Sequence, residues 1–174
     1  EREPKNLSLI FDEVVTLAHI EDYDRAWQRI EHLKKDHPES VWTLLTQAFL
    51  HRVEGQQTEA KSFAQKAVDA EEETTEAFHE LAYHTEDLEE KPTLLSKAIS
   101  LTYEVTGARM ERGIIRLQQG KYAGALQDFL RVLEKNPHHP EAIEKVEQIF
   151  GYFEQEVNRR SEDSQAYVDR AKAF

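Results

Sequence analysis

Apolar residues recur along this chain at the spacing of a helical stripe, and the stripe itself returns at a nearly fixed interval. Ala26, Ala60, Leu94 and Ala125 are separated by 34, 34 and 31 residues. An apolar residue follows each of them after four and after seven positions, as Ile30 and Leu33 follow Ala26. Offsets of four and seven lie on one face of an α-helix. A period between about 20 and 50 residues is typical of a solenoid, in which each unit buries its face against the next.

A second apolar stripe precedes each of these, so every repeat is predicted to contain two antiparallel helices joined by a short turn. In the first repeat the earlier stripe is formed by Leu7, Ile10, Val14 and Leu17. Gly55 and Gly120 suit the ends of helices, and proline after the second helix, as at Pro38 and Pro137, stops it. The sequence therefore predicts an all-α chain with repeats at 7–40, 41–74, 75–105 and 106–139.

Beyond Pro140 the pattern weakens. The spacing of apolar residues from Ile143 to Val157 predicts an amphipathic helix of roughly 20 residues. Ser161 is expected to cap a last helix, and the charge-rich stretch 154–165 suits the polar end unit that a solenoid needs. We therefore expect 140–174 to form a degenerate fifth repeat or a capping helix pair, and 1–174 to form a single domain.

These repeats resemble the tetratricopeptide repeat, a unit of about 34 residues with small residues at positions 8 and 20, an aromatic at 17 and proline at 32. The small residues at position 8 are Ala48, Ala82 and Gly113, and those at position 20 are Ala26, Ala60 and Ala125. Tyr23 and Tyr122 hold position 17, and Pro38 and Pro137 hold position 32. Val14 and Leu94 depart from the small residue expected.

The resemblance covers roughly 7–139. It implies a right-handed α-solenoid in which the first helix of each repeat lines a concave groove, and it implies protein or peptide binding rather than chemistry. The ligand-facing positions of the family predict a peptide-binding groove formed by Phe11, Val15, His19, Trp42, Leu45, Phe49, Val53, His79, Tyr83, Met110 and Ile114.

The N-terminal part of this predicted groove is strongly apolar, and its middle is acidic. Exposed apolar patches with aromatic anchors are typical of interaction sites, and an amphipathic helix or an extended apolar peptide could dock there. The alternative is that the apolar members of the first two repeats, Phe11, Val15, Trp42, Leu45 and Phe49, belong to the core.

One subclass of the family holds an acidic C-terminal peptide with a clamp of lysine, asparagine and arginine. The matching positions here are Phe11, Val15, Thr46, Glu76 and Glu80. Apolar and acidic groups replace every basic one, so a terminal carboxylate would be repelled. The sequence excludes that subclass.

The charge balance narrows the class of partner. With 34 acidic and 22 basic residues, the chain has a formal net charge of −12. Nucleic acids and anionic membrane surfaces bind basic proteins, so we expect neither, and an apolar or basic protein segment is more compatible. No apolar run is long enough to span a membrane, so direct membrane insertion is not expected.

Signals of catalysis are missing from the sequence. The chain has no cysteine and none of its eight histidines forms a recognised metal-ligand motif. We find no phosphate-binding glycine-rich loop and no serine nucleophile motif, so we expect no enzyme, cofactor or metal site. The chain starts at Glu1 without Met or a signal-peptide pattern, which indicates a trimmed form, a mature form or a piece of a longer protein.

The leading interpretation is a scaffold or adaptor that binds a protein segment, chiefly through its first two repeats. A self-assembling structural protein is the first alternative, because Trp27 and Phe63 lie beside the buried stripe of their helices and could join two copies of the chain. A chaperone-like holder of an apolar segment from a secreted or membrane partner is the second, and a module cut from a larger enzyme or sensor is the third.

Overall fold

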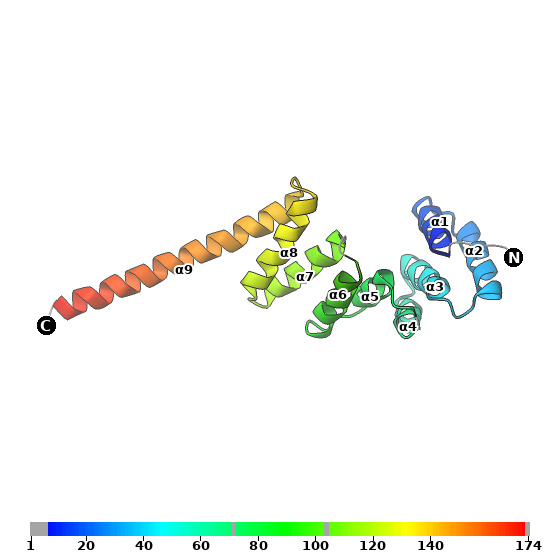
Figure 1. The fold of residues 1–174 in the computed structure, drawn as a ribbon, viewed down its shortest axis with the longest axis horizontal. Helices are drawn as coiled ribbons and strands as arrows, with labels where there is room; N and C mark the ends of the chain where they lie inside the picture. The colour runs from blue at the N-terminus through cyan, green and yellow to red at the C-terminus, as the bar shows by residue number, and fades with distance from the viewer. Residues whose placement is uncertain (1–6, 71, 103–104, 173–174) are drawn as a thin grey trace. The chain divides into compact units, whose positions relative to one another are not determined.

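The computed structural model describes residues 7–70, 72–102 and 105–172 of the chain. Every regular element in those ranges is a helix, so the predicted all-α class is confirmed (Figure 1). The helices are α1 (Leu7–His19), α2 (Tyr23–Asp36), α3 (Val41–Val53), α4 (Gln57–Val68), α5 (Thr75–Tyr83), α6 (Glu90–Leu101), α7 (Thr106–Gln118), α8 (Tyr122–Lys135) and α9 (Pro140–Lys172).

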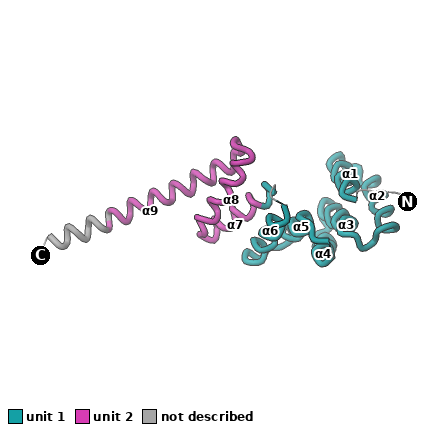
Figure 2. Tube along the Cα trace, in the orientation of Figure 1, with its two compact units in different colours: residues 1–108 teal, residues 109–174 magenta. Residues whose placement is uncertain are grey.

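The chain divides into two compact units, residues 1–108 and residues 109–174 (Figure 2). Unit 1 contains α1 to α6 as three successive helix pairs, and within it α1 packs on α3 and α3 packs on α5. Unit 2 contains most of α7, then α8 and α9, with α9 packed on α8. The first helices of the three repeats in unit 1 are therefore neighbours, as in a solenoid.

The turns within the pairs follow from local residue chemistry. Gly55 and Gly120 adopt φ of 81° and 72°, a left-handed conformation that costs glycine little. The first repeat has no glycine at this turn, and Glu21 adopts φ of 60° instead. The side chain of Asp22 then accepts a hydrogen bond from the backbone N–H of Arg25 and caps α2.

Small residues at the predicted positions allow the helices to approach closely. The alanines at positions 26, 48, 60, 82 and 125 are completely buried. Gly113 on α7 faces the ring of Phe129 on α8, and a Cβ atom at Gly113 would lie 2.6 Å from that ring. No real Cβ contact is that short, so this helix pair depends on glycine at position 113.

The predicted capping helix pair at the C-terminal end is wrong, because α9 is one continuous helix from Pro140 to Lys172. Ser161 lies inside it, and its hydroxyl donates to the carbonyl of Asn158 at 2.7 Å. Glu156 forms ion pairs with Arg159 and Arg160, three and four residues later, which stabilise a helix at this point. No proline or glycine follows Gly151 to end the helix.

In the part of the chain that the structure describes, no helix combines the length and the apolar composition needed to cross a membrane.

Candidate protein-interaction surface

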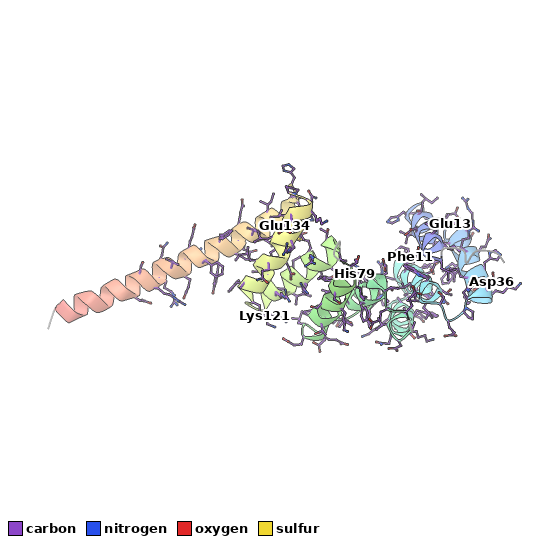
Figure 3. All side chains as sticks on the ribbon, in the orientation of Figure 1. Phe11, Glu13, Asp36, His79, Lys121 and Glu134 are labelled. Carbon is purple, nitrogen blue, oxygen red and sulfur yellow. The ribbon has the colours of Figure 1, made fainter. Side chains whose placement is uncertain are left out.

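Aromatic side chains meet where α1 packs on α3. The ring of Phe11 lies 6.0 Å from that of Trp42 and 5.9 Å from that of Phe49, measured between centroids, and meets Phe49 edge-on. All three side chains are half-buried, so each packs on the core and still presents part of its ring to solvent. Figure 3 labels Phe11 on α1. Such tilted contacts are the favoured geometry of aromatic pairs.

The cluster continues along α3 to α5 through an arginine. The guanidinium carbon of Arg52 lies 5.0 Å from the ring centroid of Phe49 and 4.6 Å from that of Tyr83, within the range of a cation–π interaction. We call Phe11, Trp42, Phe49, Arg52 and Tyr83 the aromatic row. Its last member is the most open, because Tyr83 is 55% exposed.

A carboxylate fixes the arginine of the row. Nε of Arg52 donates to Oε1 of Glu80 at 2.7 Å, and the two side chains are only 23% and 13% exposed. His84 Nε2 lies 3.3 Å from the same oxygen, and its side chain is 2% exposed. Burial lowers the pKa of His84 below its usual 6.5, although the carboxylate of Glu80 opposes this shift. Burial therefore favours the neutral form of His84 beside an Arg–Glu pair.

The structure places most of the predicted groove residues at the surface. Half-buried side chains are Phe11, Val15, Trp42, Phe49, His79 and Ile114, and exposed ones are His19, Val53 and Tyr83. Val53 is 38% exposed. The predicted groove residues that lie in unit 1 come from α1, α3 and α5. His79 is labelled on α5 in Figure 3. Ile114 belongs to unit 2.

Two residues predicted for the groove belong to the core instead. Leu45 is 1% exposed and packs in a cluster with Val41 and Leu44. Met110 is 7% exposed and packs against Ala125 and Phe129. In both cases the helix is rotated so that the apolar side chain faces the neighbouring helix, and neither residue can contact a ligand from this position.

The residues that suggested self-assembly pack within unit 1. The ring of Trp27 lies 5.0 Å from that of His51, and the ring of His51 stacks on Phe63 at 5.4 Å with an interplanar angle of 4°. Trp27 Nε1 also donates to the carboxylate of Glu54 at 3.0 Å. Trp27 and Phe63 therefore connect neighbouring repeats, with His51 between them.

Sequence reasoning missed the role of Arg52. It lies at a ligand-facing position of the family, but its pairing with Glu80, 28 residues later, joins two separate helices. The sequence did contain a signal for this pair, because Arg52 holds a groove position and the acidic Glu80 follows almost one repeat later. The pair reduces the acidic character that the sequence predicted for the middle of the groove, where Glu76, Glu86 and Asp87 stay exposed.

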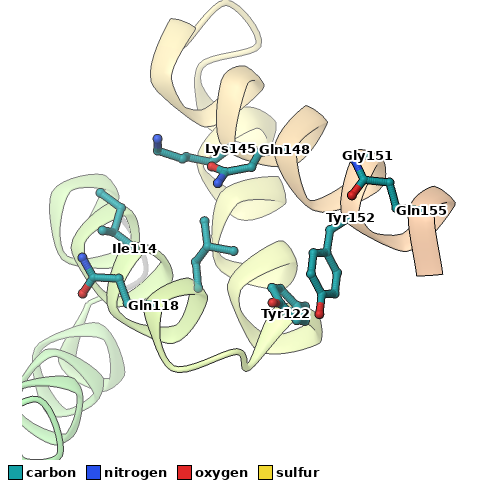
Figure 4. A pocket seen from close by; sticks show the side chains of 9 residues that line it. Ile114, Gln118, Tyr122, Lys145, Gln148, Gly151, Tyr152 and Gln155 are labelled. Atoms are coloured by element: carbon teal, nitrogen blue, oxygen red, sulfur yellow. The ribbon is translucent and has the colours of Figure 1, made fainter. Parts of the chain in front are cut away.

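Unit 2 has a hollow of its own, between the end of α7, the start of α8 and the middle of α9 (Figure 4). Tyr122 and Tyr152 meet at one side of it with ring centroids 4.3 Å apart. A hydrogen bond with Tyr152 raises the pKa of Tyr122. The lining is mixed, with apolar side chains from Ile114 and Leu117 and amides from Gln118, Gln148 and Gln155.

Within the described residues, no group of three histidine, aspartate or glutamate side chains is arranged to hold a metal ion.

No protein-family model matches the chain. Among curated proteins, DnaJ homolog subfamily C member 3 of Mus musculus is 42% identical over 55 residues, and the human protein of that name matches to the same extent. This match covers 32% of the chain and only 11% of the length of the relative, so it concerns a short part of a much longer protein.

Several solved structures are similar over most of the chain. YrrB, described as a TPR protein with an unusual peptide-binding site, has a TM-score of 0.66 at 22% identity over 83% of this chain and 76% of its own. The PilF protein of Pseudomonas aeruginosa has a TM-score of 0.72 at 17% identity, over 89% and 72%.

The first TPR domain of RPAP3, bound to the HSP90 peptide SRMEEVD, has a TM-score of 0.60 at 22% identity over 66% of this chain and 93% of its own. Likeness at these identities concerns the fold. Together with the buried small residues of the helix pairs, it shows that this chain has the tetratricopeptide-repeat fold.

Proposed function

We propose that this chain is a protein-interaction module that binds an apolar or amphipathic segment of another protein along the aromatic row. The observation that carries the proposal is the continuous series of partly exposed rings on α1, α3 and α5. YrrB is described as having a peptide-binding site, and the RPAP3 domain is bound to a peptide, which supports the general class of function.

The row is suited to anchoring because its side chains are already ordered. Phe11, Trp42 and Phe49 rest on the core of unit 1, so binding would immobilise few rotamers. Arg52 is held by Glu80 and by two rings. Ordering a long side chain costs roughly 0.5–1.5 kcal/mol on association, and a preformed arrangement avoids that cost. Rigid aromatic and arginine side chains are also the residues that dominate binding energy at interfaces.

The charges of the row select against one class of peptide. The charge of Arg52 is neutralised by Glu80, and exposed Glu76 stands on the same helix as Tyr83. A peptide such as SRMEEVD, to which the RPAP3 domain is bound, would bring further carboxylates toward these groups. We expect this chain to reject such peptides and to accept apolar ones, with or without basic residues.

A peptide-selection experiment tests the proposal. A displayed library of random peptides is panned against the wild-type chain and against a chain with Val53→Glu and Tyr83→Ser, two changes at exposed positions that leave the core intact. Peptides with apolar anchors should be enriched by the wild type and depleted by the variant. A third chain with Leu9→Ser, a change at an exposed apolar position on α1 outside the aromatic row, should enrich the same peptides as the wild type.

Enrichment of acidic C-terminal peptides, or an identical set of enriched peptides from all three chains, would contradict the proposal, because no peptide would then depend on the aromatic row. The chaperone-like function remains a special case of it, in which the bound segment belongs to a secreted or membrane protein. Identification of the enriched motif in such proteins would support that case.

A further inference from the structure

A ridge of apolar side chains on α9 is partly exposed in unit 2, although one of them, Phe153, meets the ring of Tyr122 edge-on at 6.0 Å. Phe150 is 51% exposed, Val157 is 65% exposed, and Ile143 and Phe153 are 37% and 39% exposed. Other residues of the same helix, Ala142 and Ile149, are completely buried in the core with α8. The exposed residues therefore form a second apolar face of α9, which we call the α9 ridge.

The spacing of the ridge is that of a helix–helix seam. The exposed members Ile143, Phe150, Phe153 and Val157 follow one another at intervals of 7, 3 and 4 residues. Val146, three residues after Ile143, holds the remaining position of the pattern but is half-buried against the core of unit 2. This is the a/d pattern on which a second helix packs. From Ile143 to Val157 the ridge extends about 21 Å along the helix axis, which is enough for about four turns of a partner helix.

Acidic residues stand along the open edge of the ridge. Glu147 lies four residues after Ile143 and three before Phe150, and Glu154 lies in the same relation to Phe150 and Val157. At those spacings each carboxylate shares the face of the apolar residues beside it. Both glutamates are exposed, whereas Glu156, on another face, is engaged by Arg159 and Arg160.

We infer that the α9 ridge binds an amphipathic helix of another protein whose apolar stripe is flanked by lysine or arginine. The apolar stripe would cover Phe150 and Val157, and the basic residues would pair with Glu147 and Glu154. A second copy of this chain fits less well, because it would bring the same glutamates against each other in a protein of net charge −12. The site is separate from the aromatic row, which lies in unit 1.

Binding of two model peptides to the full chain tests the inference. Both are helical peptides of about 18 residues (about 27 Å long) with one leucine stripe, flanked by lysine in one and by glutamate in the other, and binding is measured by fluorescence anisotropy. The lysine peptide should bind at least tenfold more tightly, and raising NaCl from about 50 to about 500 mM should weaken its binding severalfold, because salt screens the charge pairs.

Variants locate the binding site. Phe150→Glu with Val157→Glu should weaken binding of the lysine peptide at least tenfold. The control Leu9→Glu, the same change at a residue 62% exposed in unit 1, should leave it within about twofold. Glu147→Lys with Glu154→Lys changes only exposed side chains and should reverse the preference, so that the glutamate peptide binds more tightly.

Three results would overturn the inference. One is equal binding of the two peptides by the wild type, and another is unchanged binding by the charge-reversed chain. The third is a dimer in sedimentation that the Phe150→Glu/Val157→Glu change dissociates, because the occupant would then be a second copy. The same peptides are measured on the Val53→Glu/Tyr83→Ser chain, which changes Tyr83 of the aromatic row and the exposed Val53. Because binding to the row is removed in this chain, a tenfold loss on adding Phe150→Glu/Val157→Glu is assigned to the α9 ridge.

Discussion

The guanidinium of Arg52 lies over the ring of Tyr83, with 4.6 Å between the guanidinium carbon and the ring centroid. This contact joins α3 of one repeat to α5 of the next. Since the same guanidinium also lies over Phe49 and is bonded to Glu80, a single side chain connects three groups on two helices. Its removal should therefore affect both stability and the presentation of the row.

We predict that Arg52→Ala lowers the free energy of unfolding by about 1–3 kcal/mol, because Glu80 keeps a nearly buried charge with no cationic partner in place of the arginine. Arg52→Lys should recover only part of the loss, since an ammonium cannot stack on two rings as the planar guanidinium does. Urea unfolding of the three chains measures both effects. Equal stability of Arg52→Ala and the wild type would show that the pair contributes nothing.

His84 should make the stability of the chain depend on pH. Burial sets its pKa below the usual 6.5, so the unfolded chain binds the proton more tightly than the folded chain. The stabilisation is complete above about pH 6.5 and is lost as the pH falls through the folded-state pKa. Denaturant unfolding from pH 7.5 to pH 5 should show a smaller decrease for His84→Gln than for the wild type. His32→Gln, a change at an exposed histidine, should retain the wild-type decrease; identical slopes for all three would refute the role of His84.

Two glycines of unit 2 should respond in opposite directions to alanine. At Gly113 the new methyl group would meet the Phe129 ring at 2.6 Å, and overpacking of this kind costs about 1–3 kcal/mol. At Gly151, inside α9, nothing lies within 4 Å of the new atom, and alanine should stabilise the helix by roughly 0.5–1 kcal/mol. Thermal unfolding of the two variants gives the sign directly. A stabilised Gly113→Ala would mean that α7 and α8 do not approach as closely as described.

The buried carboxylate of Asp128 should be critical for unit 2. Its side chain is 3% exposed and is bonded by Arg112, with Nε to Oδ2 at 3.0 Å, and by Arg116 Nη1 at 2.8 Å. Asp128→Ala leaves Arg112, which is 11% exposed, without this counter-ion, and we expect a loss of about 3–5 kcal/mol.

Glu134→Gln provides the matched control for Asp128→Ala. Glu134 pairs with Arg131 in a bridge whose two side chains are each about half exposed, and its loss should change the free energy of unfolding by less than about 1 kcal/mol. A similar small effect for both variants in urea unfolding would contradict the importance assigned to Asp128.

The helix pairs could be predicted from the sequence because their signals are local. The offsets of four and seven residues identify the buried stripe, and a glycine or proline marks each of several helix ends. The side of the helix on which a given apolar residue is buried depends on packing between helices rather than on local spacing. Leu45 is buried because α3 packs against α1, α2, α4 and α5. Nearly all faces of α3 therefore contact protein. The spacing of apolar residues within α3 does not distinguish a groove residue from a core residue.

Two further differences remain. Ser161 has the residue type of a helix cap, but no glycine or proline beside it ends the helix, and α9 continues through it. The bond of Arg52 to Glu80 joins residues 28 positions apart, and its geometry follows from the packing of α3 on α5. Local sequence patterns predicted the helix pairs. The burial of Leu45 and the bond of Arg52 to Glu80 depend on how the helices pack on one another.

The most direct test of the proposed function is the dissociation constant of one enriched apolar peptide for the wild-type chain and for Trp42→Ala/Phe49→Ala, after circular dichroism has shown that both are folded. Binding should be at least tenfold weaker for the variant, because aromatic anchors carry most of the energy of such interfaces. Equal dissociation constants for the two folded chains would contradict binding along the aromatic row.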